Sequence, residues 1–214
     1  MKWNLLTIGL FVFTSVSAQN NKQQYPTPEF ENEIYYLNKE NSSLVRLEKG
    51  NSGLKTKTTL GGIGGSENSF VIENEKSPVQ IKEGSSLSFI YFTHESNSGV
   101  TVSSDTTSKS TKTGPKVNGV WDMMNNPSQT TSLYNAYPDQ GTRKVVLQSS
   151  AGMRLIGKSK ESKKFTFSVR KIRPGYLELV IDKPLPRGNY MFVVMGGFEI
   201  NMDGSVDLFA FEIV

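Results

Sequence analysis

The chain has 214 residues, a formal net charge of +4 at neutral pH and no cysteine. The absence of thiols excludes disulfide scaffolds and thiolate metal sites, so the fold must be held together by its apolar core. The length is sufficient for one domain or two small ones, and so mild a positive charge does not by itself indicate nucleic-acid binding.

The N-terminus has the pattern of a secretory signal peptide. Lys2 precedes an apolar run at residues 5–13, and a small-residue cleavage site ends at Ala18. The run is too short to span a bilayer, and no cysteine follows the cleavage site to carry a lipid. We therefore predict a signal peptide at residues 1–18 and an exported protein, periplasmic or extracellular, with no membrane span after cleavage.

The mature chain is predicted to contain a flexible leader at residues 19–30 and a single domain at residues 31–214. Two parts of this domain lack a regular pattern. Residues 50–65 are rich in Gly, Lys and Thr and predict a mostly irregular connection. A longer stretch, at about residues 93–142, is rich in Ser, Thr, Asn and Gly. We interpret it as a loop insertion, because long irregular segments in compact domains are usually functional or disordered.

Short β-strands are predicted along the rest of the domain, from alternating apolar and polar residues or from brief apolar runs between turn residues. The expected ranges are 34–37, 44–47, 70–72, 78–81, 87–92, 143–148, 165–170, 177–181, 190–195 and 206–213. The first two form a hairpin. The last is apolar on both faces, which predicts a strand inside a sheet and covered on both sides.

No segment shows sustained helical periodicity, and about eight to ten short strands separated by turn residues are typical of all-β folds. We predict a single antiparallel β-sandwich, or an open barrel, with one long irregular middle loop.

Aromatic side chains in the middle segment are candidates for ligand binding. Trp121, Tyr134 and Tyr137 offer apolar rings with polar edges, which suit the faces of sugars, and Asp122 adjoins the first of them. The alternative is that these rings anchor the segment to the core.

A basic stretch follows, with eight Lys and Arg residues and one acid between Arg154 and Arg173. We expect Lys158, Lys160, Lys163 and Lys164 to attract phosphate, sulfate or uronate groups of envelope polymers. The alternative is ordinary solvated charge.

Three patterns resemble catalytic or ion-binding sites without completing them. His94 is the only histidine and no nucleophile elbow accompanies it. The glycines at residues 61–65 lack the lysine and helix of a phosphate loop. Residues 201–207 alternate oxygen ligands as a calcium loop does, but Val214 stands where the bidentate Glu is needed. We expect no catalytic residue, no metal and no cofactor.

The domain also resembles a loose group of uncharacterised exported bacterial proteins. The resemblance rests on the signal peptide and on the motifs Ile34-Tyr35-Tyr36, Phe89-Ile90-Tyr91-Phe92, Leu185-Pro186-Arg187-Gly188-Asn189-Tyr190-Met191-Phe192 and Leu208-Phe209-Ala210-Phe211. In that group the turn commonly reads Leu-Pro-x-Gly-Glu-Tyr, and here Asn189 takes the place of Glu. The resemblance implies a β-sandwich at the envelope and no catalytic residue.

These observations favour a non-catalytic binding module at the cell envelope or outside the cell, whose partner is an envelope polysaccharide or another envelope protein. Two alternatives stay open. A structural subunit of a surface assembly would need an exposed edge strand or a donor segment such as the leader. A hydrolase would need two carboxyl groups facing one cleft, for example Asp122 and Asp139.

Overall fold

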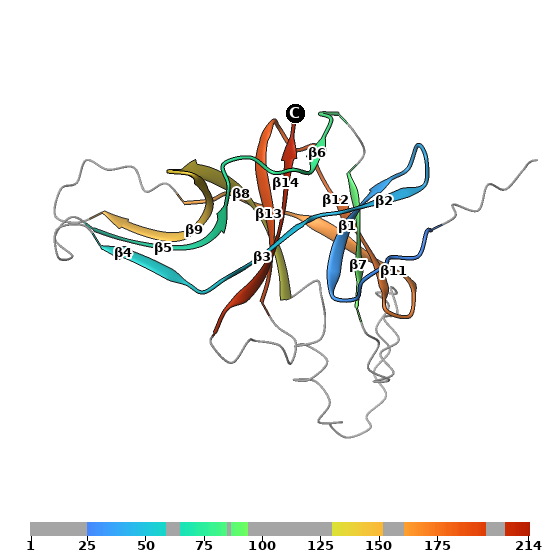
Figure 1. Cartoon of the computed structure of the whole chain (residues 1–214), viewed down its shortest axis with the longest axis horizontal. Helices are drawn as coiled ribbons and strands as arrows, with labels where there is room; N and C mark the ends of the chain where they lie inside the picture. Colours follow the sequence, from blue (N-terminus) through green and yellow to red (C-terminus); the bar gives the residue numbers. More distant parts are fainter. Residues whose placement is uncertain (1–24, 59–64, 85–86, 94–129, 152–160, 196–203) are drawn as a thin grey trace, which may run out of the picture.

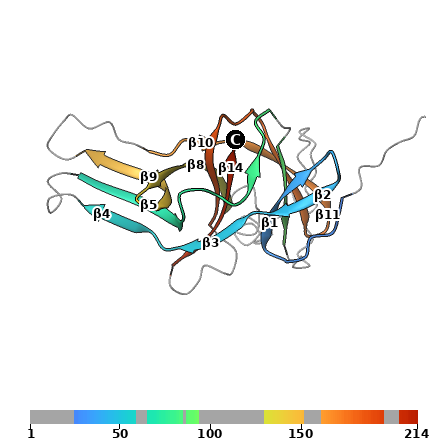
Figure 2. The same cartoon turned by 45° about the horizontal axis from the view of Figure 1, so that its top comes forward.

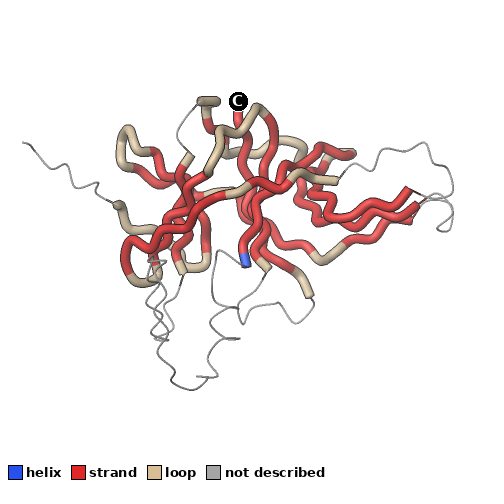
Figure 3. The backbone as a smooth tube through the Cα atoms, turned by 180° about the vertical axis from the view of Figure 1, so that it is seen from behind, coloured by secondary structure: helices blue, strands red, loops and turns tan. Residues whose placement is uncertain are grey.

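The computed structural model describes residues 25–58, 65–84, 87–93, 130–151, 161–195 and 204–214; the expected signal peptide lies outside them. Apart from the single helical residue Thr130, the secondary structure in these ranges consists of β-strands (Figure 3). Their bounds are β1 Glu33–Asn38, β2 Ser43–Arg46, β3 Glu48–Ser52, β4 Lys55–Thr58, β5 Gly65–Glu73, β6 Gln80–Ile81, β7 Ser88–Phe92, β8 Thr131–Asp139, β9 Thr142–Ala151, β10 Lys164–Phe165, β11 Phe167–Arg173, β12 Tyr176–Ile181, β13 Gly188–Val194 and β14 Val206–Ile213.

The strands form two sheets. One has five strands in the order β11-β12-β7-β1-β2. The other has the order β3-β14-β13-β8-β9-β5-β4, with β10 paired to β8 and β6 paired to β14. Pairing is antiparallel except between β6 and β14. The all-β class and the antiparallel sheets are therefore confirmed, and the larger sheet is curled into a half-barrel.

The main core lies between the two sheets. Phe89 of β7 packs against Phe192 of β13 and Phe211 of β14, with ring centroids 5.1 Å and 4.9 Å away. All three rings are fully buried. They lie on the inner faces because successive side chains in a strand point to opposite sides of the sheet.

A second core lies on the other face of the larger sheet. Phe70 and Ile72 of β5 and Val145 of β9 pack there against Met191 and Leu208, on β13 and β14. The far ends of β5 and β9 extend with β4 away from the central strands (Figures 1 and 2). The strand β14 is thus covered on both sides, by the smaller sheet and by the curl of its own sheet. Its predicted place inside a sheet is confirmed.

The curl brings β3, at one edge of the sheet, close to β5. The Val71 amide donates a hydrogen bond to Ser52 Oγ at 3.1 Å. A Cβ atom on Gly50 would lie 2.7 Å from Ile72 Cδ1, so the two strands approach closely where a glycine leaves room. The chain then continues into β4, which pairs with β5.

Two predictions of irregular structure are corrected. The strand β8 lies within the predicted loop insertion and occupies the middle of the larger sheet; residues 94–129 of that insertion lie outside the described residues. The strands β3 and β4 overlap the predicted connection at residues 50–65. The strands β3 and β4 are mostly polar, so no apolar pattern predicts them. They are held extended by hydrogen-bonded pairing with β14 and β5.

Candidate functional site

Four of the eight predicted binding residues lie in the described part of the chain: Tyr134, Tyr137, Lys163 and Lys164. Trp121, Asp122, Lys158 and Lys160 lie outside it, as do His94, residues 61–64 and residues 201–203.

The short strand β10 brings the basic stretch against the predicted aromatic residues. In its pairing with β8, Lys164 stands opposite Tyr134 and Phe165 stands opposite Leu133. The Lys164 ammonium lies over the Tyr134 ring, 5.9 Å from its centroid. The Lys163 ammonium lies over the Phe165 ring at 5.0 Å. Two sets of residues that were predicted separately therefore meet at this strand pair.

The segment before β10 fills a fork between β8 and β9. These strands pair only beside their turn, and β9 then diverges to pair with β5. Ser162 enters the gap, where its amide donates to the Val146 carbonyl at 2.8 Å and its Oγ accepts from the Val146 amide at 3.0 Å. The Asn135 amide also donates to the Lys163 carbonyl at 3.1 Å. Hydrogen bonds to β8 and β9 thus fix the backbone that carries Lys163 and Lys164.

Tyr137 anchors this segment. Its hydroxyl donates to the Glu161 carbonyl at 3.3 Å. Tyr134 and Tyr137 are three positions apart on one strand and so point to opposite faces of the sheet. They do not form one flat stacking platform.

The exposed chemistry at this strand pair is cationic. Lys163 and Lys164 are both exposed, and neither ammonium forms an ion pair with another described residue. Each ammonium lies over a ring, at Phe165 and Tyr134, so it occupies an aromatic face that a sugar would need for stacking. Phe165 packs against the main core and Tyr134 against the second core, so the two ammonium groups flank β10 on opposite faces of the sheet. We name these two lysines, with the rings beneath them, the β10 lysine surface.

Asp139, one half of the carboxylate pair considered for a hydrolase, is held by a lysine. Lys144 Nζ lies 3.0 Å from Asp139 Oδ2 and 2.7 Å from Glu67 Oε1. Burial lowers the pKa of Lys144, but hydrogen bonds to Glu67 and Asp139 outweigh burial and raise it above its ordinary value. These carboxylates therefore surround a permanent cation, and Asp122 lies outside the described residues.

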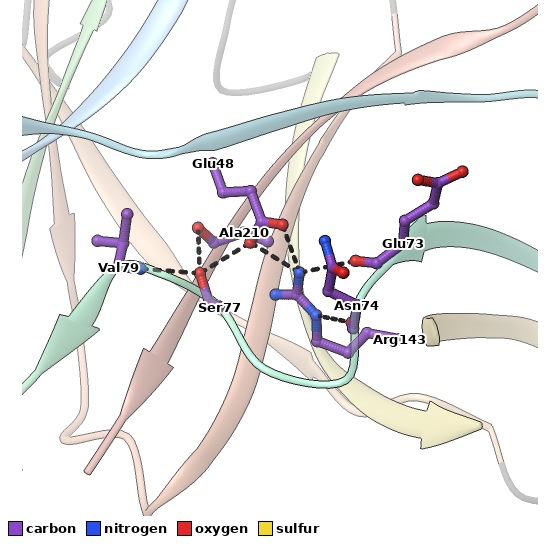
Figure 4. Close-up of polar contacts among 7 residues, drawn as sticks. All are labelled: Glu48, Glu73, Asn74, Ser77, Val79, Arg143 and Ala210. Atoms are coloured by element: carbon purple, nitrogen blue, oxygen red, sulfur yellow. Dashed lines mark hydrogen bonds and ion pairs between the residues drawn. The ribbon is translucent and has the colours of Figure 1, made fainter. Parts of the chain in front are cut away.

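A buried arginine that the sequence pattern does not predict lies at the start of β9 (Figure 4). Arg143 has a side chain only 1% exposed, and its Nη2 lies 2.7 Å from both carboxylate oxygens of Glu48. Its Nε donates to the Asn74 carbonyl at 2.8 Å and its Nη2 to the Glu73 carbonyl at 3.2 Å. Ser77 Oγ also donates to Glu48, at 2.9 Å.

This cluster holds the connection between β5 and β6 in place. Asn74 has a positive φ of 66°, which is typical of left-handed backbone, and its carbonyl accepts a hydrogen bond from Arg143. No sequence pattern marks Arg143 as buried, because a basic residue at the start of a strand normally faces solvent. We assign the cluster a structural role.

Within the described residues, no group of three His, Asp or Glu side chains is placed to hold a metal ion. No helix there is long and apolar enough to cross a membrane. Comparison of the chain with known protein families, curated proteins and solved structures found no match.

Proposed function

We propose that this protein is an exported, non-catalytic binding module that holds an anionic polymer of the cell envelope or its surroundings at the β10 lysine surface. The observation that supports this proposal is the position of Lys163 and Lys164, exposed, without carboxylate partners among the described residues, and each over an aromatic ring.

The physical basis is Coulomb attraction to a repeating negative charge. In this respect Lys163 and Lys164 differ from Lys144, whose charge is neutralised by ion pairs with Glu67 and Asp139. The ring beneath each ammonium limits the movement of the side chain, so less entropy is lost when an anion binds. Uronate, sulfate and phosphate groups fit this surface better than the face of a neutral sugar, because the ring faces are already occupied.

The test is a double substitution, Lys163→Gln with Lys164→Gln, measured by affinity chromatography on heparin and by calorimetric titration with polygalacturonate. We expect the variant to elute from heparin at a lower salt concentration than the unchanged protein. We expect its affinity for polygalacturonate to fall by roughly tenfold, about 0.7 kcal/mol for each lost contact. Binding by the unchanged protein should weaken as salt is added.

The matched control is Lys55→Gln with Lys57→Gln. These lysines are also exposed on a short strand, β4, and their loss changes the net charge by the same amount. Equal losses in the two double variants would show attraction to overall charge and would overturn the assignment of the β10 lysine surface.

A further inference from the structure

The outer face of the five-stranded sheet, opposite the main core, is apolar and covered. Tyr35 and Leu37 of β1, Ile90 of β7 and Tyr176 of β12 form a separate buried cluster there. Residues 25–30, the second half of the predicted leader, lie on this face and supply part of its cover.

The first anchor of this segment is the hydroxyl group of Tyr25. It donates to Glu178 Oε2 at 3.1 Å and accepts from Arg170 Nη2 at 2.7 Å. Glu178 is fully buried on β12 and is also hydrogen-bonded by Ser88 and Arg170. Burial raises the pKa of Glu178, but these hydrogen bonds and the charges of Arg170 and Lys39 outweigh burial. The pKa therefore lies below its ordinary value, and the carboxyl stays ionised. The sheet thus binds the Tyr25 hydroxyl between two charged side chains, Glu178 and Arg170.

The second anchor is a backbone carbonyl of the segment. Tyr176 donates its hydroxyl to the Pro26 carbonyl at 2.8 Å, and the Tyr25 ring meets the Tyr176 ring edge-on at 5.9 Å. Burial raises the pKa of Tyr176 to about 12, so its hydroxyl keeps the proton that it donates. Arg173 adds a longer contact, from Nη2 to Thr27 Oγ1 at 3.4 Å.

The third anchor lies at the other end of the segment, over β1 and β2. The Phe30 amide donates to the Tyr35 hydroxyl at 2.9 Å, and that hydroxyl donates to the Phe30 carbonyl at 3.3 Å. The Arg46 guanidinium lies over the Phe30 ring, 4.6 Å from its centroid, and is also paired with the buried carboxylate of Glu33. The segment is therefore held at both ends by side chains of the sheet.

The segment is suited to recognition as an extended peptide. Pro26 and Pro28 have fixed φ angles and no N–H groups, and each restricts the residue before it to extended backbone. Little conformational entropy is lost when such a segment binds, and side-chain pockets rather than strand pairing must recognise it.

We infer that the outer face of the five-stranded sheet is a peptide-binding surface that accepts, besides the chain's own residues 25–30, the same segment of a second copy of this chain. All the groups that receive the segment belong to β1 or to later residues. Only residues 31–32 join the segment to β1, and Asn32 has a left-handed φ of 57°. An extended backbone there would release the segment, and exchange between two copies would reproduce every contact. This surface shares no residue with the β10 lysine surface.

The test uses a labelled peptide with the sequence of residues 25–32, Tyr-Pro-Thr-Pro-Glu-Phe-Glu-Asn, and fluorescence anisotropy. The receptors are the unchanged protein and its Tyr25→Ala variant, whose own segment has lost the first anchor. We expect the variant to bind the peptide about tenfold or more tightly than the unchanged protein, because a tethered segment competes at millimolar effective concentration.

Two controls isolate the anchors. A peptide carrying Tyr25→Phe lacks only the hydroxyl that meets Glu178, and a receptor carrying Tyr25→Ala with Tyr176→Phe lacks only the further donor to Pro26. Both should bind more weakly, and thermal melts show that each receptor is folded. A folded Tyr25→Ala protein that does not bind the peptide, or that binds both peptides equally, would overturn the inference.

Discussion

At the scale of single residues, the buried charges in the described ranges each lie beside an opposite charge. Glu178 is held by Arg170, Glu33 by Arg46, and Arg143 by Glu48. Removing one member of a buried pair is costly, because the other charge remains without its partner in a poorly solvated place. Two of these pairs join neighbouring strands, β11 with β12 and β1 with β2, and their arginines also contact residues 25–30. The third pair holds the turn between β5 and β6.

Glu178 should make the stability of the protein sensitive to acid. Its pKa in the folded protein lies below the ordinary value of 4.5, so its contribution is complete above that value and is lost as the pH falls through the folded pKa. We expect the melting temperature to fall below about pH 4.5. Glu178→Gln should cost about 1–3 kcal/mol at neutral pH and flatten this fall.

The control for this prediction is Glu83→Gln, which removes an exposed ion pair with Arg187. Such pairs contribute about 0–1 kcal/mol, so its acid profile should follow that of the unchanged protein. Thermal melts between pH 3 and pH 7 make the comparison. A Glu178→Gln profile as steep as that of the control would contradict the role given to Glu178.

At the scale of elements, the position of a strand depends on its partners more than on its own pattern. The alternating run at residues 165–170 was expected to form one strand. It divides at Thr166 into β10, in the larger sheet, and the start of β11, in the smaller one. This division places the lysines of β10 beside β8. In contrast, β14 is apolar on both faces and is buried on both, as its sequence predicts.

The central place of β14 predicts a large effect of truncating its side chains. Phe211→Ala should destabilise the protein by about 3–5 kcal/mol, because it opens a cavity between Phe89, Phe192 and Tyr190. Val45→Ala, at a side chain that is 42% exposed on β2, should change stability by about 0.5 kcal/mol or less. Urea unfolding of both variants measures the difference, and similar midpoints would contradict the placement of β14 in the core.

At the scale of the whole molecule, the curl of the larger sheet creates two cores from one sheet. The near ends of β5 and β9 cover one face of β13 and β14, and the five-stranded sheet covers the other. The curl is completed where β3 passes β5, at the contact between Gly50 and Ile72. A glycine is needed there because any Cβ would displace the isoleucine.

Gly50→Ala should therefore destabilise the protein by about 1–3 kcal/mol through overpacking. Gly53→Ala is a matched control, because a Cβ at Gly53 would meet nothing within 4 Å. Adding Ile72→Val to Gly50→Ala should recover part of the loss, since it removes Cδ1, one of the two isoleucine atoms that the new methyl group meets, and leaves Cγ1. Additive effects in this double-mutant cycle would contradict the proposed contact.

The sequence alone determined the all-β class, the early hairpin and the interior place of the last strand, because alternation and apolar runs report directly which faces are buried. It also marked Tyr134, Tyr137, Lys163 and Lys164, but as two unrelated groups. Only the tertiary structure decided that these groups meet, that β8 is a central strand, that Arg143 is buried and that residues 25–30 cover the smaller sheet. Each of these features depends on contacts between residues distant in the chain, and such contacts leave no local pattern.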